Sequence, residues 1–151
     1  MHPSIRSLGI AAVVATMLAG LSEVRPASAA TCTINGTAYT VTKTGSGVIA
    51  GTTGNDVILG SPGNDKITGS GGDDDKVCAL GGHDDITMGA GVDEVDAGTG
   101  NDKVRAGDAT DLIYGGEGND SLAGGNGGDF VYGGPGDDKI TLGAGDDWAF
   151  G

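Results

Sequence analysis

The stretch that decides the fold is GGPGDDKIT, at residues 133–141. It is one regular copy of a nine-residue unit, Gly-Gly-x-Gly-x-Asp-x-aliphatic-x, that recurs from Gly51 to the end of the 151-residue chain. Repetition at a fixed period determines an architecture more strongly than any local propensity does. The sixth place of the unit is an aspartate in eleven consecutive copies: Asp56, Asp65, Asp75, Asp84, Asp93, Asp102, Asp111, Asp120, Asp129, Asp138 and Asp147.

Each unit predicts a turn followed by a short strand. The first six residues are rich in Gly, Asn and Asp, and the last three alternate around an aliphatic residue. Side chains alternate across a strand, so the eighth place must face the interior and the seventh and ninth must face outward. One core residue per unit is a thin core, which each unit can bury only by stacking on its neighbours. The sequence therefore predicts an all-β solenoid over residues 51–151.

The aspartates should form two columns. If two units complete one coil, like units stack 18 residues apart, at the strand spacing of about 4.8 Å. One column then holds Asp56, Asp75, Asp93, Asp111, Asp129 and Asp147, and the other holds Asp65, Asp84, Asp102, Asp120 and Asp138. Carboxylates about 5 Å apart repel by roughly 3 kcal/mol at an effective dielectric near 20, so the columns need counter-cations.

Two sources of positive charge are available to these columns. Lys66, Lys103 and Lys139 follow aspartates of the second column, whereas only Lys76 follows one of the first. We therefore expect the first column to depend more on an outside ion. Oxygen ligands from carboxylates and turn carbonyls suit a hard cation, and Ca²⁺ tolerates irregular geometry better than Mg²⁺.

The unit resembles the RTX, or haemolysin-type, calcium-binding nonapeptide over residues 51–151. The resemblance implies a right-handed parallel β-roll of about eleven repeats, with Ca²⁺ held by the sixth-place aspartates and turn carbonyls of adjacent turns. Such sharing would give nine sites at most. One inserted residue within 69–78 leaves Asp74 as an alternative to Asp75 and puts the sites beside it in question. Ala109 replaces a turn glycine and should strain its turn if that place needs a left-handed backbone.

Two segments precede the repeats. Residues 1–29 read as a secretory signal peptide, with Arg6, an apolar run at 8–21 and a small-residue cleavage site at 27–29. The run is shorter than the roughly 20 residues that span a bilayer, although an uncleaved anchor is the alternative. Residues 30–50 predict a hairpin around Asn35-Gly36, which we interpret as an N-terminal cap of the stack.

The net charge excludes some binding partners, and the two cysteines predict a disulfide. The net charge of −13 opposes binding to nucleic acid or to an anionic membrane surface, and we expect no membrane insertion of the mature chain. An exported chain whose only cysteines are Cys32 and Cys78 is expected to form a disulfide. Cys78 is a ninth-place residue facing outward, within reach of a hairpin folded over the outer face; two free thiols are the alternative.

A group of large apolar residues occupies seventh and ninth places near the C-terminal end. All of them should face outward on one side of the stack: Leu112, Tyr114, Phe130, Tyr132, Trp148 and Phe150. Such a patch indicates a partner surface, while cross-strand stabilisation of the last coils explains it equally well.

The sequence contains no His-Glu-x-x-His, no Gly-x-Ser-x-Gly, no P-loop and no EF-hand loop spacing. The sequence therefore predicts a secreted, non-enzymatic protein that folds on binding several calcium ions. One alternative is a calcium-dependent adhesive, matrix or self-associating scaffold with a protein or glycan partner. The other is the detached C-terminal repeat region of an exported hydrolase.

Overall fold

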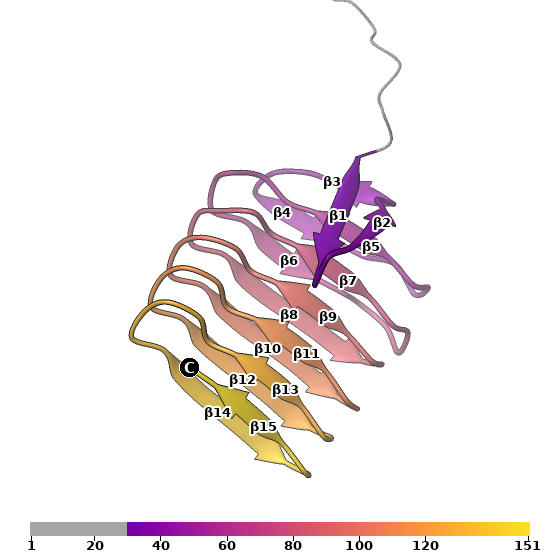
Figure 1. Cartoon of the computed structure of the whole chain (residues 1–151). Helices are drawn as coiled ribbons and strands as arrows, with labels where there is room; N and C mark the ends of the chain where they lie inside the picture. Colours follow the sequence, from indigo (N-terminus) through magenta and orange to yellow (C-terminus); the bar gives the residue numbers. More distant parts are fainter. Residues whose placement is uncertain (1–29) are drawn as a thin grey trace, which may run out of the picture.

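The computed structural model describes residues 30–151, which form a β-solenoid of two parallel sheets with the core between them (Figure 1). The predicted signal peptide and its cleavage site lie outside these residues. The six-stranded sheet has the order β14-β12-β10-β8-β6-β4: Lys139–Ala144, Ser121–Asn126, Lys103–Asp108, Asp85–Ala90, Lys66–Thr68 and Val48–Ala50. The seven-stranded sheet has the order β15-β13-β11-β9-β7-β5-β3: Trp148–Phe150, Phe130–Tyr132, Leu112–Tyr114, Glu94–Asp96, Lys76–Cys78, Val57–Leu59 and Lys43–Thr44.

The strands pair with the register that the repeat predicts. Ile113 lies opposite Val95 on one side and Val131 on the other, at separations of 18 residues. Alternate units therefore belong to alternate sheets, and each coil contains two units. The all-β parallel roll expected from the sequence is confirmed. Within residues 30–151 there is no apolar helix of membrane-spanning length.

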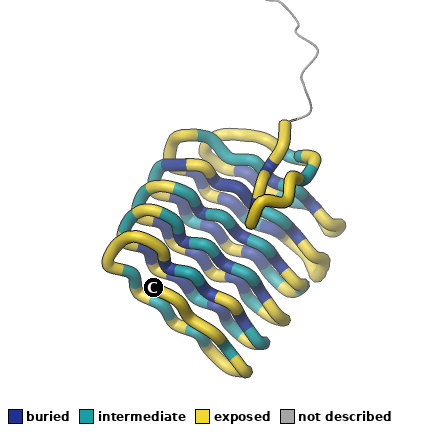
Figure 2. The backbone as a smooth tube through the Cα atoms, in the orientation of Figure 1, coloured by how far each residue is buried: buried dark blue, intermediate teal, exposed yellow. Residues whose placement is uncertain are grey.

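The core runs as a continuous stripe along the stack (Figure 2). Eighth-place residues from Ile58 to Val131 are at most 1% exposed. Burial of one such side chain contributes about 1.5–3 kcal/mol. First-place residues add to this core, because they lie two positions after the eighth place and share its face. They are Ala79, Met88, Ala97 and Ala106, all buried, so the core is thicker than one residue per unit.

The N-terminal segment differs from the predicted cap at residues 30–50. Only β1 (Thr31–Ile34) and β2 (Thr37–Thr40) form the hairpin, with positive φ at Asn35 and Gly36 as a tight two-residue turn requires. Residues from Lys43 onward already form the first coil, because β3 pairs with β5 and β4 with β6.

The hairpin also lies in a different place from an end cap. Strand β1 crosses the outer face of the seven-stranded sheet over β5, β7 and β9 (Figure 1). Its buried side chains Cys32 and Ile34 pack there with Val57, Leu59 and Tyr114. The hairpin therefore covers the apolar outer face of this sheet, where the sequence placed it beside Cys78, and does not close the end of the stack.

Candidate metal centre

The two predicted columns of aspartates lie along the two edges of the roll, where turns pass from one sheet to the other. Each aspartate ends a turn immediately before a strand begins. Nine of the eleven are buried: Asp56, Asp65, Asp75, Asp84, Asp93, Asp102, Asp111, Asp120 and Asp129. Asp138 and Asp147, in the last coil, are half-buried. A column of buried carboxylates lowers the stability of the fold unless each oxygen has a hydrogen-bond partner or a cation.

One oxygen of each carboxylate is held by the neighbouring coil. The backbone N–H of Asp93 donates to Oδ1 of Asp111 over 2.9 Å, and that of Asp102 donates to Oδ1 of Asp120 over 2.8 Å. The same bond recurs in all nine steps of the two columns, from Asp56 to Asp147 and from Asp65 to Asp138. We call this series the aspartate ladder. It fixes the position of each carboxylate and satisfies a buried N–H group.

The second oxygen is left without a donor along the middle of both columns. Six buried Oδ2 atoms have no hydrogen-bond partner, those of Asp84, Asp93, Asp102, Asp111, Asp120 and Asp129. An unpaired buried polar atom costs about 1–3 kcal/mol, and more when it is charged. These oxygens point back over their own turns: a Cβ on Gly115 would lie 2.5 Å from Oδ2 of Asp120.

Backbone carbonyls of the turns face the same gaps between coils. Gly118 and Gly136, at the fourth place of their units, have φ of +136° and +149°. A Cβ on Gly118 would collide with the carbonyl oxygen of Gly100, and one on Gly136 with that of Gly118. Only glycine allows this approach, which directs carbonyl oxygens toward the next coil. Carboxylate and carbonyl oxygens together are the donor set that Ca²⁺ prefers.

The composition of such a site follows from the repeat. No three carboxylate, imidazole or thiol groups converge anywhere in residues 30–151. Each turn carries one column aspartate, so a cation between two coils meets two carboxylates at most and must take its other ligands from carbonyls. The residues present therefore fit an oxygen-ligated cation and not a thiolate or imidazole site.

Burial and mutual repulsion make the middle aspartates hard to ionise. The pKa of Asp111 is raised to about 7, mainly by burial and also by the charges of Asp93 and Asp129, which together outweigh the hydrogen bond from the Asp93 backbone. Burial likewise raises the pKa values of Asp93 and Asp102 to about 6. The pKa is raised, again mainly by burial, at Asp75, Asp84, Asp120 and Asp129. A cation in the gaps would favour the ionised form.

A family model for the RTX calcium-binding nonapeptide repeat matches the chain in four copies, at residues 42–75, 50–86, 87–122 and 123–151. The chain belongs to this family. The matched region begins at residue 42, so it includes the coil formed by β3 and β4 as well as all eleven RTX units. No curated protein and no solved structure matches the chain.

Two irregular RTX units keep the ladder intact. In the unit with the inserted residue, Asp75 occupies the column, with Oδ1 accepting from Asp56 and its N–H donating to Asp93. Asp74 instead accepts from the N–H of Val92, outside the column. The N–H of Asp111 still donates to Asp129 beyond the turn of Ala109.

Three residues other than glycine carry a left-handed backbone within the RTX turns. Ala109 has φ of +83°, as its place in the unit predicts. Leu80 at +82° and Ser70 at +73° stand at second places, which the sequence analysis did not single out. Their signal was the same as that of Ala109, a side chain where the pattern has glycine. Such conformations cost about 1–3 kcal/mol each and persist only where the surrounding structure holds them.

The lysines do not neutralise the second column, contrary to expectation. In the part of the chain that the structure describes, the ion pairs are Lys76 with Glu94 and Arg105 with Asp85, and neither includes a column aspartate. Lys66, Lys103 and Lys139 are exposed. Their seventh place lies on the outer face of the strand, opposite to the sixth and eighth.

The first two RTX units satisfy their carboxylates differently. Oδ2 of Asp56 accepts from the backbone N–H and the hydroxyl of Thr52, and its Oδ1 accepts from the hydroxyl of Thr42. Burial acts to raise the pKa of Asp56, but these hydrogen bonds and the charge of Lys43 outweigh it and leave that pKa below its usual value. Asp56 is therefore readily ionised.

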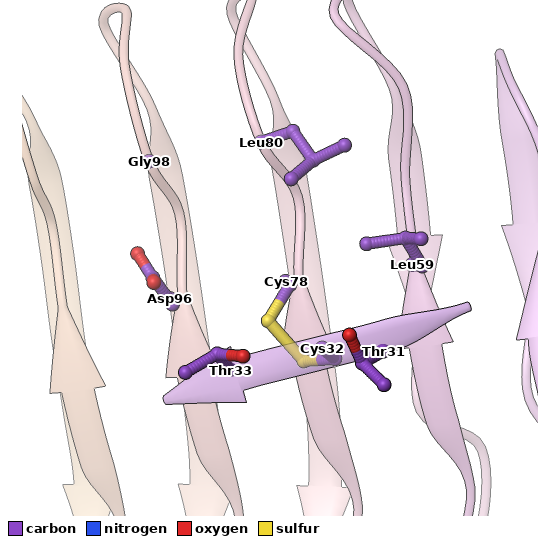
Figure 3. A pocket seen from close by; sticks show the side chains of 8 residues that line it. All are labelled: Thr31, Cys32, Thr33, Leu59, Cys78, Leu80, Asp96 and Gly98. Atoms are coloured by element: carbon purple, nitrogen blue, oxygen red, sulfur yellow. A yellow bond between two sulfur atoms is a disulfide. The ribbon is translucent and has the colours of Figure 1, made fainter. Parts of the chain in front are cut away.

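The hairpin is bonded covalently to the RTX roll. Cys32 and Cys78 form a disulfide, with Cα atoms 5.6 Å apart and 46 residues between them in sequence (Figure 3). Both cysteines are buried. Cys78 is the ninth-place residue of β7 and projects from the outer face, where β1 crosses it. The disulfide closes a loop that contains the first coil and the first two RTX units.

The outward apolar residues form two stacks on the seven-stranded sheet. Tyr114, Tyr132 and Phe150 stack with ring centroids 4.9 and 4.7 Å apart. Phe130 and Trp148 stack at 4.8 Å, and Leu112 lies next to Phe130 in the pairing of β11 with β13. We call these six residues the aromatic ladder. Leu112 and Tyr114 also line a hollow with Asn35, at the tip of the hairpin.

Proposed function

We propose that this chain is a secreted calcium-binding protein whose RTX roll folds as Ca²⁺ binds between stacked turns. The observation that carries the proposal is the set of six buried Oδ2 atoms with no donor. A cation would satisfy these oxygens in their ionised form and reduce the repulsion along the columns. The turn carbonyls supply further oxygen ligands, and the lysines lie on the wrong face to compete.

Coupling between binding and folding follows from the same oxygens. The gaps between coils exist only in the folded roll, so the free energy of binding becomes free energy of folding. Extracellular calcium modules bind at about 10⁻⁴–10⁻³ M, far above the concentrations that intracellular sensors detect. The roll would then fold after export. The signal-peptide pattern of residues 1–29 and the Cys32–Cys78 disulfide support export, because disulfides persist in oxidising compartments.

We assign the roll a binding function without catalysis. His83, the one histidine outside residues 1–29, lies exposed in a turn. Its backbone N–H donates to Oδ1 of Asn64, and its ring Nδ1 accepts from the backbone N–H of Asn101. A general base needs an oriented nucleophile within hydrogen-bond reach, and His83 is instead one link in a series of turn-to-turn contacts.

The test is circular dichroism of the mature chain during a calcium titration. We expect strand signal to develop as calcium rises to about 10 mM, above the range of extracellular modules. Asp120→Asn keeps an Oδ1 acceptor for the ladder but removes the charge, and it should raise the calcium midpoint about tenfold. Asp137→Asn is the matched control, because this exposed neighbour in the next turn lies outside the columns. A spectrum that calcium leaves unchanged would refute the proposal.

A second candidate function is calcium-dependent self-association through the aromatic ladder. Phe130, Trp148 and Phe150 are 37%, 48% and 47% exposed, large fractions for such side chains. Their rings stack within 15° of parallel, so neighbours cover most ring faces and the edges meet solvent. This arrangement favours a flat protein surface over a sugar, which needs free ring faces. Coils must stack before the ladder exists, so its assembly would depend on calcium.

Sedimentation velocity in saturating calcium tests this candidate. We expect a dimer or larger species that disappears in Phe130→Ser/Trp148→Ser. Val48→Ser/Leu80→Ser is the control, since both residues are exposed and apolar but lie outside the ladder. Identical monomers for all three proteins would remove self-association as a function.

A further inference from the structure

The second place of the repeating unit divides the roll into two parts. The first two units have hydroxyl residues there, Thr52 and Ser61, whereas every unit from residue 88 onward has glycine. The third unit has Ser70, which its inserted residue places five positions before Asp75 instead of four. The second place lies four residues before the column aspartate, at the point where Oδ2 is directed. A hydroxyl at this place can therefore reach the oxygen that remains unpaired in the later coils.

The hydroxyls of Thr52 and Ser61 both bond to the Oδ2 atom of the aspartate in their own unit. The Thr52 hydroxyl donates to Oδ2 of Asp56 over 2.8 Å. The Ser61 hydroxyl donates to Oδ2 of Asp65 over 3.0 Å, with the Ser61 backbone N–H donating to the same atom over 2.7 Å. On the other oxygen, Oδ1 of Asp65 accepts from the N–H of Gly47 in the first coil. Each of these two carboxylates thus has three donors from the chain itself.

The backbone of these two turns differs as well. Gly54 and Gly63, at the fourth place, lie outside the left-handed region, and no carbonyl of a neighbouring coil lies near the position of a Cβ on either. In the later units, Gly118 and Gly136 have left-handed φ and lie against the carbonyl oxygen of the preceding coil. The first turns therefore lack both the free carboxylate oxygen and the close carbonyl that characterise the later gaps.

We propose that the hydroxyl and backbone donors of Thr52 and Ser61 replace the cation at the start of each column, so that this end of the roll is folded without calcium. The inference rests on the proposed calcium function. It divides the chain into a part that folds without calcium and a part that needs calcium to fold. The N-terminal part, residues 30–68 with β7 bound to it by the Cys32–Cys78 disulfide, forms a metal-independent template. The turns from Asp84 to Asp129, whose Oδ2 atoms are unpaired, add to this template when calcium is present.

Independent features stabilise the same end without a metal. The hairpin buries Cys32 and Ile34 against Val57 and Leu59, and the disulfide restrains the chain between them. Thr42, one coil before Asp56, donates its hydroxyl to Oδ1 of Asp56 and accepts the N–H of Val57. In the later coils, the aspartate ladder contains only backbone N–H groups and carboxylates. Apolar burial, a disulfide and hydroxyl donors replace at this end what calcium would supply further along.

Hydrogen–deuterium exchange of the mature, oxidised chain tests the division peptide by peptide. In chelator, we expect amides of β4–β6 (residues 48–68) to be protected and those of β10–β13 (residues 103–132) to exchange freely. Saturating calcium should protect the second group with little change in the first. Equal lack of protection in both groups without calcium, with protection of both by calcium, would overturn the template while leaving the calcium function standing.

A double variant tests the hydroxyls themselves. Thr52→Val/Ser61→Ala should make exchange in residues 48–68 about tenfold faster in chelator, because each hydroxyl bonds a charged group. Its calcium midpoint for residues 103–132 should match that of the wild-type chain. Thr53→Val/Ser46→Ala is the matched control, since both side chains are exposed, Thr53 in the turn of Thr52 and Ser46 in the turn one coil before that of Ser61. Equal exchange in variant and control would overturn the inference, whereas absence of any calcium response would overturn the proposed function with it.

Discussion

Asp56 and Asp111 occupy the same place of the same repeat, in the same column, and have opposite environments. Asp56 accepts three hydrogen bonds from Thr42 and Thr52, and its pKa lies below the usual value. Asp111 has one oxygen in the ladder and one unpaired, and burial raises its pKa to about 7. A repeat aspartate is therefore not a metal ligand by position alone. The residue four places before it, Thr52 for Asp56 and Gly107 for Asp111, decides whether a side chain of the same turn donates to Oδ2.

The largest effect should come from removing the disulfide, which lies only on the template side of this comparison. A loop of 46 residues contributes about 4 kcal/mol when closed by a disulfide. Cys32→Ser/Cys78→Ser should therefore abolish exchange protection of residues 48–68 in chelator. Saturating calcium should restore most of this protection, because the later coils still fold and give β6 and β7 the strands β8 and β9 to pair with. Protection that survives the double variant in chelator would contradict the role given to the hairpin.

The next effect contrasts the two aspartates directly. Asp111→Asn removes a charge that is buried only when the later coils fold, so it should weaken calcium binding and leave the template unchanged in chelator. Asp56→Asn replaces a carboxylate that accepts three hydrogen bonds, and it should destabilise the template by about 1–3 kcal/mol with or without calcium. Urea unfolding in chelator and in calcium measures both changes. If both variants lowered the free energy of unfolding in chelator, the two ends of the roll would not differ as proposed.

A smaller effect should appear on changing pH. The pKa values of Asp93, Asp102 and Asp111 are raised in the fold, so the stability they contribute is present below about pH 4 and lost as the pH rises through about 6 to 7. In chelator, the central coils should be more stable at pH 4.5 than at pH 7.5. Protons compete with calcium for these carboxylates, so the calcium midpoint should fall over the same rise in pH. Asp56, with its lowered pKa, should lose stability only at lower pH.

The smallest effect concerns Ala109. Ala109→Gly should stabilise the calcium-bound roll by about 1 kcal/mol, because glycine accepts the left-handed backbone without strain. Ala123→Gly, in β12, is the control and should destabilise by a similar amount, since glycine weakens a strand interior. Thermal unfolding in calcium measures both. Equal destabilisation by the two substitutions would mean that the turn carries no strain.

The period of nine made the roll predictable from sequence. Because the repeat fixes which residues share a face, it gave the 18-residue register and the aspartate columns without any knowledge of contacts. The same alternation places Met88 and the first-place alanines inside, two residues after the eighth place, although only the eighth-place residues were predicted to form the core. The coil of β3 and β4 was missed because it lacks the column aspartates: the strand register puts Val41 opposite Asp56 and Gly47 opposite Asp65.

The remaining differences depend on geometry that a linear pattern does not contain. The hairpin sequence around Asn35-Gly36 predicts a turn but does not by itself predict the surface on which the hairpin packs, which depends on Val57, Leu59 and Tyr114 from two coils. Lys66 follows an aspartate closely in sequence, yet its seventh place puts it on the opposite face. The hydroxyls of Thr52 and Ser61 were visible as substitutions for glycine, but their effect appears only when Oδ2 is seen to point toward them.

The aspartate ladder has a polarity that gives the two ends of the stack different growth properties. Every N–H in it belongs to the earlier coil and every Oδ1 to the later one. A coil added at the C-terminal side therefore brings its carboxylates to donors that are already fixed in position. Assembly in the opposite direction would place fixed carboxylates first and leave them charged and unbonded until the next coil arrived. The roll is thus suited to extension from its N-terminal end, one coil at a time, in the order in which the chain is synthesised.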